Sequence, residues 1–413
     1  MNYNLFIAKK IAGKGSNQKV SSLSNKIATV SISISLIVMI IAVAIALGFK
    51  DEVGDKAKGF SGQIIFSALG VEPNSDIYPI KSDLSYKPMV SELKGVKTIS
   101  NVAYSPGMLK TTNYVQGVVF KGVDSTYNFD FFANHLVEGD LPQFTGKRPS
   151  NEILISTKLA NILGYKVGDK LIAYYIKETT SVRSFIIAGL YQAELEDIDK
   201  TLTLVDIRHI RRLNGWQDNE VSSMELMLDD GVNESALIGK IEQIMSCHSK
   251  DEDGPVVVRS VRELYPHLFD WLDLMDLNVI IVLGLMILVA GFNMISGLLI
   301  ILFEKIAMIG LLKSLGMQDK SIVKVFIYRG SFLLNMGMLW GNIIGLTFIC
   351  LQKYCKIIPL DSSNYFVNYV PIKFGVVEFL TINIAAYLLI ILVMYIPTLF
   401  IAKISPDKSI KLS

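Results

Sequence analysis

Four long apolar segments constrain this chain more than any other feature of its sequence. They cover about residues 27–48, 276–303, 322–351 and 376–402. The first holds 22 consecutive residues without a charged side chain. A helix of that length rises about 33 Å, enough to cross the hydrocarbon core of a bilayer. Only 19% of all residues are charged, against roughly 25% in soluble domains. The sequence therefore predicts four transmembrane helices.

The first apolar segment is too long for a typical cleaved signal peptide, whose apolar core usually covers about 7–15 residues. The small residues that resemble a cleavage site, Ala42-Val43-Ala44, lie inside the apolar run and not after it. We therefore expect an uncleaved span.

The distribution of lysines predicts the orientation of the spans. Residues 1–26 carry five lysines and no acidic residue, and further lysines lie in the turn 304–321 and in the tail 403–413. Cytoplasmic flanks of membrane proteins carry an excess of Lys and Arg. We therefore expect both termini and this turn in the cytoplasm. Residues 49–275 and the short loop 352–375 then lie on the opposite side of the membrane.

The segment 49–275 is long enough for an independent domain, and its pattern is mixed. Helices are expected at 157–163 and 233–245. Short runs rich in β-branched and aromatic residues predict strands; they lie at 63–66, 118–120, 152–155, 171–175 and 185–188. The order of these pieces indicates an outer insertion at about 115–215 within a basal unit. The predicted fold class is a membrane α-helical protein whose four transmembrane helices enclose, between helices one and two, a large α/β extracytoplasmic domain.

Several kinds of chemistry are not indicated by the sequence. It holds no G-x-x-x-x-G-K-[ST] pattern, so we do not expect this chain to hydrolyse ATP, and it holds no H-E-x-x-H or G-x-S-x-G. The net charge of +2 gives no basic field for nucleic acid. Its three cysteines lack C-x-x-C spacing, so neither zinc nor a disulfide framework is expected. We predict no catalytic residues, no metal and no cofactor.

Two spacings in the sequence leave alternatives open. Asp270, Asp273 and Asp276 fall on one helix face before the second span; a solvated face is favoured over a cation site. Gly337, Gly341 and Gly345 form a ridge of small residues in the third span, which lets another helix approach closely. That helix can belong to this chain or to a partner. Asn293, a polar group in the second span, is expected to face protein and not lipid.

The turn after the second span reads EKIAMIGLLKSLGM over residues 304–317. This resembles the signature found at that place in FtsX/MacB-type permeases of ABC transporters. GFNMI at 291–295 and LGFK at 47–50 look like motifs of the lipoprotein-releasing LolC/LolE branch, and ISPDKSI at 404–410 is similar to the family's C-terminal ending. The likeness extends over nearly the whole chain.

The resemblance implies a MacB-like periplasmic core domain, a location in the cell inner membrane, and two paired permease chains, identical or different. A separate cytoplasmic ABC ATPase dimer would bind the ATP. The segment after the second span would be the coupling helix that contacts this ATPase, in place of an ordinary amphipathic turn. The residues expected to make or orient the contact are Glu304, Lys305, Ile306, Ile309, Gly310, Leu312, Lys313, Leu315 and Gly316.

The branch also implies a cargo, a lipoprotein that leaves the inner membrane, with a periplasmic carrier as a further candidate partner. Its groove is expected near the first two spans, at Ser35, Met39, Val43 and Asn293. The family's carrier-recruiting chain has a long proline-bearing hook, whereas this chain has a short hairpin with its expected tip at 177–184 and no proline there. Direct carrier docking through a hook is therefore not expected. Alternative functions are a MacB-like exporter of small molecules or peptides and an FtsX-like transducer to cell-wall hydrolases.

Overall fold

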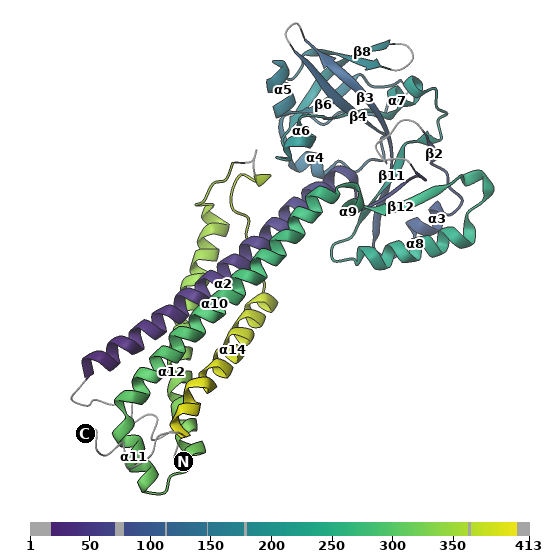
Figure 1. Cartoon of the computed structure of the whole chain (residues 1–413). Coiled ribbons are helices and arrows are strands. Elements are labelled where there is room, and N and C mark those ends of the chain that lie inside the picture. The colour runs from purple at the N-terminus through teal and green to yellow at the C-terminus, as the bar shows by residue number, and fades with distance from the viewer. Residues whose placement is uncertain are drawn as a thin grey trace. The chain divides into compact units, whose positions relative to one another are not determined.

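The computed structural model describes residues 18–70, 78–111, 114–146, 148–176, 180–361 and 365–402 (Figure 1). These residues form two compact units. The helical unit contains the chain as far as Asp51 and the segments Leu272–Pro359 and Tyr369 onward, and the α/β unit contains Glu52–Trp271 and Leu360–Asn368.

The helical unit is built from four helices of membrane-spanning length and a short one. The long helices are α2 (Gln18–Ser61), α10 (Pro266–Glu304), α12 (Asp319–Cys355) and α14 (Val376–Ala402), and the short one is α11 (Ile306–Ser314). Each long helix holds a window apolar enough to cross a membrane. The four predicted spans are therefore confirmed as helices. Three of these helices extend beyond the apolar segment, because polar residues at their ends continue the same backbone hydrogen bonding.

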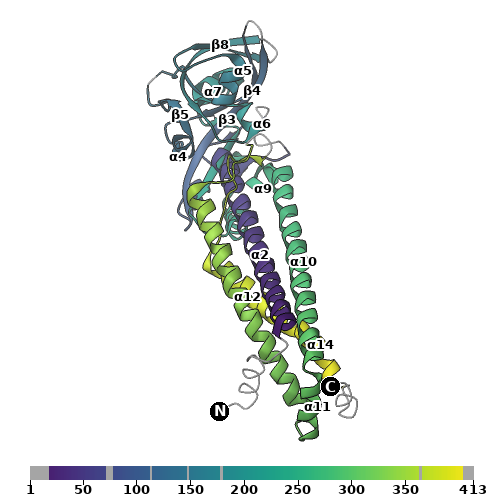
Figure 2. The same ribbon diagram turned by 90° about the vertical axis from the view of Figure 1, so that its left-hand side faces the viewer.

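The long helices share a continuous apolar core. Ile32 of α2, Met294 of α10, Leu334 of α12 and Met394 of α14 are all buried in one cluster. A second cluster lies around Leu36 and Ile40 of α2. Figure 2 shows α2, α10 and α12 running alongside one another. Because each helix contributes to a shared core, the unit is held by packing between its own helices.

The glycine ridge of α12 packs against α2 of the same chain. A Cβ atom on Gly337 would lie 2.8 Å from Ile32, one on Gly341 3.0 Å from the carbonyl oxygen of Ser33, and one on Gly345 3.3 Å from Ile40. The Ser33 hydroxyl donates to the carbonyl oxygen of Gly337 over 2.8 Å. Small residues at a helix interface allow such close backbone approach. The ridge is thus occupied within this chain.

Gly48 of α2 lies against the backbone at Pro371, and replacing it tests the fold. A Cβ atom at this position would lie 2.4 Å from the carbonyl oxygen of Pro371. Overpacking of this kind costs about 1–3 kcal/mol, which exceeds the gain of roughly 0.5–1 kcal/mol that alanine brings to a helix interior. Gly48→Ala is therefore expected to lower the midpoint of thermal unfolding of the detergent-solubilised chain.

Gly54 of the same helix provides the matched control, because nothing lies within 4 Å of a Cβ atom built there. Gly54→Ala is expected to leave the midpoint unchanged or to raise it, by the helix-propensity gain alone. Equal midpoints for the two variants would contradict the contact between Gly48 and the chain at Pro371.

The α/β unit is organised around one large sheet with strand order β12-β1-β11-β3-β4-β9-β6-β8-β5, in which β7 pairs with β3 and β8. A separate pair is formed by β10 and β2. The strands are β1 (Ile64–Ala68), β2 (Ile80–Lys81), β3 (Val96–Lys110), β4 (Val115–Val123), β5 (Leu136–Gly139), β6 (Glu152–Ser156), β7 (Lys170–Ile176), β8 (Thr180–Tyr191), β9 (Leu202–Asp206), β10 (Glu220–Val221), β11 (Ser223–Leu228) and β12 (Val256–Ser260).

Short helices join these strands. They are α3 (Lys87–Ser91), α4 (Asp130–Asn134), α5 (Thr157–Leu163), α6 (Glu196–Asp199), α7 (Ile207–Asn214), α8 (Glu234–His248) and α9 (Val261–Leu264), with a 3₁₀ turn at Asp251–Asp253. Helix α5 matches the predicted segment because its ends carry strong local signals. The Ser156 hydroxyl accepts from the backbone N–H of Leu159, and Gly164 ends the helix with a φ of 74°. The sheet core contains Phe66, Phe120 and Tyr175.

The predicted hairpin is present, but its expected tip was too long. Strands β7 and β8 are antiparallel and stay paired as far as Ile176 and Thr180. Residues 180–184 therefore belong to β8, where Val182 is a β-branched residue of the kind that favours a strand. Residues 177–179 lie outside the described residues, as do residues 1–17 of the expected N-terminal segment 1–26 and the tail 403–413. Residues 18–26 of that segment belong to α2.

Candidate functional site

The segment after α10 forms a separate short helix with well-defined ends. The α10 helix stops at Glu304, and α11 starts at Ile306 after Lys305, whose φ of −104° departs from helical geometry. At the other end the N–H of Met317 donates to Leu312 O and that of Gly316 to Lys313 O, each over 3.0 Å. Gly316 has a φ of 86°. These are the two hydrogen bonds of a Schellman motif, so Gly316 ends the helix.

One face of α11 is anchored in the helical unit and another is exposed. Ile309 and Gly310 are buried, and Ile309 belongs to the core that includes Ile301 and Ile322. Leu311 is 56% exposed and Leu315 76% exposed. The sequence prediction grouped Ile309 with Leu315 on a contact face. The structure places Ile309 inward, and it adds Leu311, a residue that the sequence prediction left out.

The remaining residues of the predicted contact occupy intermediate positions. Ile306 and Leu312 are half-buried. Glu304 and Lys305 form an ion pair of 3.4 Å between themselves. The ammonium group of Lys313 lies 2.8 Å from the carboxylate of Asp319 in the first turn of α12. This ion pair thus stabilises the turn between α11 and α12. The negative charge of Asp319 also interacts favourably with the dipole at the N-terminus of α12.

The four residues expected to line a cargo groove are not brought together on one open surface. Ser35 and Met39 are each 2% exposed and lie within the helix packing, because α12 and α10 cover that face of α2. Val43 is half-buried. The side-chain amide of Asn293 donates to the hydroxyl of Ser31 on α2, so this polar group does face protein.

The exposed face of α2 is a different one. Its large exposed side chains are Ile27, Val30 and Ile34, each more than half exposed. Their spacing of three and four residues places them along one stripe of the helix. We refer to these three residues as the α2 stripe. The sequence missed it because Ser33 and Ser35 are buried here while the apolar side chains of the stripe are exposed, so the polarity of the residues does not distinguish the buried face from the exposed one.

The aspartate row before the second span is partly neutralised by a lysine. The ammonium group of Lys50 lies 2.6 Å from the carboxylate of Asp276 and 3.5 Å from that of Asp273. Among the described residues no group of three or more His, Cys, Asp or Glu side chains is arranged to hold a metal ion. This geometry supports an ion-paired helix face, and Lys50 belongs to the LGFK motif at 47–50.

A buried lysine that the sequence analysis did not single out connects three segments of the α/β unit. Lys56 of α2 is 4% exposed. Its ammonium group lies 2.6 Å from the carboxylate of Glu194 and donates to the carbonyl oxygen of Phe366 over 3.0 Å. Glu194 and Phe366 both have positive φ values, of 67° and 59°. Such conformations are unfavourable for non-glycine residues, so the contacts of Lys56 help to hold both segments in place.

Asp199 completes this cluster and is the titratable group most affected by it. Its carboxylate accepts from the backbone N–H of Glu194 over 2.9 Å. Burial raises the pKa of Asp199 to about 6, although hydrogen bonds from the Glu194 and Ala193 backbone and the charge of Lys56 oppose the change. The carboxylate therefore takes up a proton in the mildly acidic range.

The folded-state pKa of Asp199 lies above its ordinary value of 3.8. Between about pH 4 and 6 the folded chain holds a proton that the unfolded chain has released, so stability falls as the pH rises through this window. Two pKa units correspond to about 3 kcal/mol. Asp199→Asn is therefore expected to flatten the dependence of the thermal midpoint on pH between 4 and 6, and to raise the midpoint at pH 7.

The exposed Asp230 supplies the control, because Asp230→Asn removes a carboxylate that is not buried. The pH dependence of that variant should match the parent chain. An Asp199→Asn variant with the same slope as the parent would contradict the assignment.

A second buried charge cluster lies inside the sheet. The ammonium group of Lys121, which has no exposed surface, is 2.8 Å from the carboxylate of Glu225. It also donates to the Phe60 carbonyl and to the Tyr127 hydroxyl. The Tyr104 hydroxyl donates to the other oxygen of Glu225 over 2.8 Å. Burial by itself would lower the pKa of Lys121. The interactions with Glu225 and Tyr127 together have the larger effect, so the pKa is raised and the side chain stays protonated.

Comparison with known proteins identifies the type of chain to which these features belong. The sequence profile of the FtsX-like permease C-terminal family matches residues 280–406. That of the MacB-like periplasmic core domain matches residues 27–244, more than half of the 413 residues. The first match contains α11, and the second contains most of the α/β unit.

Individual relatives are more distant. The lipoprotein-releasing system transmembrane protein LolC of Neisseria meningitidis serogroup B is 23% identical over 342 residues, which are 76% of this chain and 78% of that protein. LolC of Xylella fastidiosa is 24% identical over 277 residues, 63% of this chain and 64% of that protein. The periplasmic region of MacB from Actinobacillus actinomycetemcomitans superposes with a TM-score of 0.36 and 14% identity, covering 50% of this chain and 91% of that one.

The two family matches together cover both units of the structure. Permeases of this type are the non-catalytic transmembrane components of ABC transporters and work with an ATPase partner. This chain is therefore a multi-pass membrane protein of the FtsX/MacB permease family, with a MacB-like α/β periplasmic domain between its first and second membrane-length helices.

Proposed function

We propose that this chain is a permease subunit that releases lipid-modified proteins from the inner membrane, powered by a separate ABC ATPase. The observation that carries the proposal is the similarity to LolC of Neisseria meningitidis, a protein of a lipoprotein-releasing system, over 76% of this chain. The match is long enough to involve both units and not only the coupling turn.

The same proposal includes the orientation of the chain in the membrane and the side on which each segment lies. The termini and the turn 304–321 lie in the cytoplasm, and residues 49–275 and 352–375 lie in the periplasm. The excess of lysine in the first set of segments supports this arrangement. Two permease chains pair, and two copies of the ATPase bind beneath them.

The contact with the ATPase is proposed at the exposed face of α11. Leu311 and Leu315 offer apolar side chains for a groove of the partner, while buried Ile309 and the Lys313–Asp319 ion pair connect α11 to the helical unit. A displacement of α11 is thereby passed to α12 as a rigid-body movement.

The path of the cargo is proposed along the α2 stripe in place of Ser35 and Met39, which are covered by neighbouring helices. The side chains of Ile27, Val30 and Ile34 can receive acyl chains or the second permease chain, and Val43 lies further along the same helix. The paired part of the β7–β8 hairpin ends at Ile176 and Thr180, which leaves little chain for a carrier-binding hook.

The proposal is tested by depleting the protein in its own host and locating mature lipoproteins by membrane fractionation. Lipoproteins destined for the outer membrane should accumulate in the inner membrane. Restoring the parent chain should reverse this, whereas a chain lacking α11 should not.

Normal lipoprotein sorting after depletion would refute the proposal. Altered sensitivity to small toxic molecules with normal sorting would support a MacB-like exporter instead. Altered cell-wall hydrolysis with normal sorting would support a signal transducer.

A further inference from the structure

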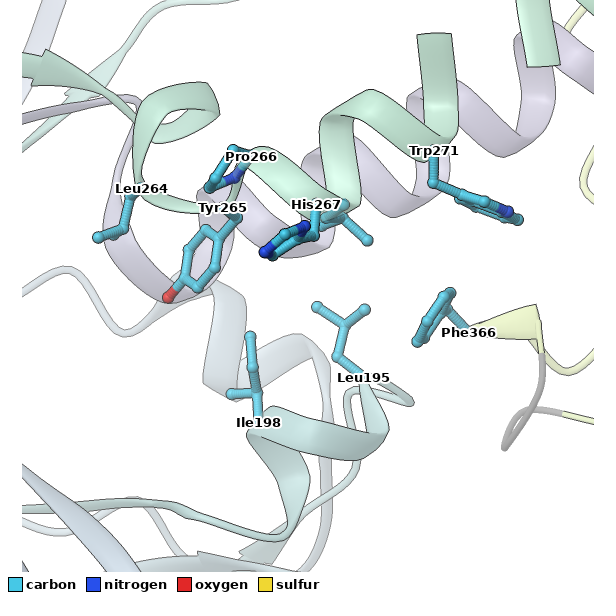
Figure 3. Close-up of a pocket in the computed structure, with 9 residues that line it drawn as sticks. Leu195, Ile198, Leu264, Tyr265, Pro266, His267, Trp271 and Phe366 are labelled. Atoms are coloured by element: carbon cyan, nitrogen blue, oxygen red, sulfur yellow. The ribbon is translucent and has the colours of Figure 1, made fainter. Parts of the chain in front are cut away.

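The α/β unit contains an apolar cavity of about 570 Å³. Leu195 and Ile198, at α6, line one side, and Leu264 and the first turns of α10 line the other. Figure 3 shows the side chains of Leu195, Ile198, Trp271 and Phe366 converging on the same space. The volume lies within the range of roughly 300–1,000 Å³ that is typical of small-molecule sites.

The lining of this cavity offers little to a polar ligand. None of the described residues that line it is Asp, Glu, Lys or Arg, and its polar side chains are the His267 imidazole and the Tyr265 hydroxyl. The Tyr265 hydroxyl already shares a hydrogen bond of 2.8 Å with Ser61. Trp271 and Phe366 meet edge to face with ring centroids 5.8 Å apart, which builds one wall from aromatic carbon. The cavity is thus suited to an uncharged hydrocarbon group.

A smaller chamber of about 200 Å³ shares the walls formed by Ile198, Leu264 and Tyr265. It contains Glu225, but both carboxylate oxygens of this residue are engaged, one by Tyr104 and one by Lys121. The interior therefore presents no unpaired carboxylate to a ligand's head group. A ligand with one polar and one apolar end is expected to enter with its apolar end first.

Trp271, which lines the cavity, belongs to α10. Trp271 is followed three residues later by Leu274, which begins a row along this helix in which every member is more than half exposed: Leu274, Leu277, Ile281, Leu285, Leu288 and Phe292. Three residues of helix correspond to about 4.5 Å. Tryptophan is also enriched where membrane helices leave the hydrocarbon.

We propose that this cavity binds a single acyl chain of the lipid-modified cargo after the chain has left the bilayer, with the polypeptide part outside. The assignment rests on the proposed function, which supplies the acylated cargo. The cavity's apolar lining and the engaged charges behind it favour a hydrocarbon tail.

Trp271 provides a direct probe of occupancy. The chain has three tryptophans, so Trp216→Phe with Trp340→Phe leaves Trp271 as the only indole. This variant, full length and in maltoside micelles, is titrated with a synthetic lipopeptide that carries one brominated acyl chain. Bromine quenches indole fluorescence at contact. We expect saturable quenching with one lipopeptide per chain.

Two further variants report whether the cavity is the site. Ile198→Arg places a charge in the lining, and Ile198→Phe narrows the cavity without a charge. Both should raise the half-saturation concentration at least tenfold. Ile186→Arg, at a position of β8 that is 51% exposed, is the matched control and should bind as the parent does.

A lysophospholipid with the same brominated chain separates the two sources of acyl groups. Saturable quenching by both probes, or by the lipopeptide alone, supports the proposal. Quenching that rises linearly with probe and is equal in all variants overturns it, as does saturation by the lysophospholipid alone. Either negative result, obtained while depletion still traps lipoproteins in the inner membrane, removes the cavity assignment and leaves the proposed function intact.

Discussion

Replacing Glu225 by glutamine is expected to lower the free energy of unfolding by about 3–5 kcal/mol, the usual cost of breaking a buried ion pair. The substitution leaves the ammonium group of Lys121 without a counter-charge at a position that has no exposed surface. It also weakens the hydrogen bond from the Tyr104 hydroxyl. The measurement is the thermal midpoint of the full chain in detergent, followed by intrinsic fluorescence.

A double variant and a surface variant make this expectation specific. Lys121→Met combined with Glu225→Leu removes both charges. This double variant should recover much of the lost stability, because neither side chain then carries a charge that must be desolvated on folding. Glu242→Gln, on the exposed face of α8, should change the midpoint very little. A Glu225→Gln midpoint equal to that of Glu242→Gln would show that the buried pair contributes nothing.

Replacing Leu311 and Leu315 by glutamate is expected to release the ATPase while leaving the permease folded. Both side chains are more than half exposed, so the charges need not enter the core of the helical unit. Loss of central apolar anchors at an interface costs about 2 kcal/mol or more, which corresponds to at least a thirtyfold weaker complex. The measurement is the amount of ATPase that co-purifies with the tagged permease.

Two other substitutions near α11 separate contact from folding. Gln318→Glu adds the same charge at an exposed position in the adjoining turn and should retain the ATPase. Gly310→Asp, by contrast, introduces a charge at a buried position and should lower thermal stability as well. Undiminished co-purification of the ATPase with the doubly substituted chain would exclude this face of α11 as the contact.

The four spans could be predicted because their signal is local and redundant: a charge-free run long enough to cross a bilayer admits few other structures. The extension of α2 as far as Ser61 was missed, since residues after Gly48 are largely polar. The buried positions Val53, Ala57 and Phe60 do follow the helical period. This period is hard to recognise in the sequence because polar residues surround it.

Strand β3 could not be predicted from its local sequence. It is the longest strand described, yet it contains Pro106 and Gly107, residues that usually mark a turn. Pro106 is tolerated because β3 changes partners along its length, from β11 at its start to β4 and β7 at its end. No short-range pattern in the sequence encodes that exchange.

The sequence located the candidate site but did not show which of its side chains are exposed. The motif at 304–317 located the coupling segment, whereas the choice between Ile309 and Leu311 as the outward residue depends on where Ile301 and Ile322 lie. Lys56 and Lys121 gave no signal at all, because an isolated lysine resembles any surface lysine until its carboxylate partner is brought to it from more than a hundred residues away.

The glycine ridge of α12 has a mechanical consequence. Because Gly337, Gly341 and Gly345 leave no space between α12 and α2, the two helices cannot slide past each other without breaking backbone-close contacts, and they act as one stiff element. Helix α11 directly precedes α12 in the helical unit. Under the proposed mechanism, a displacement of α11 would therefore move α12 and α2 together.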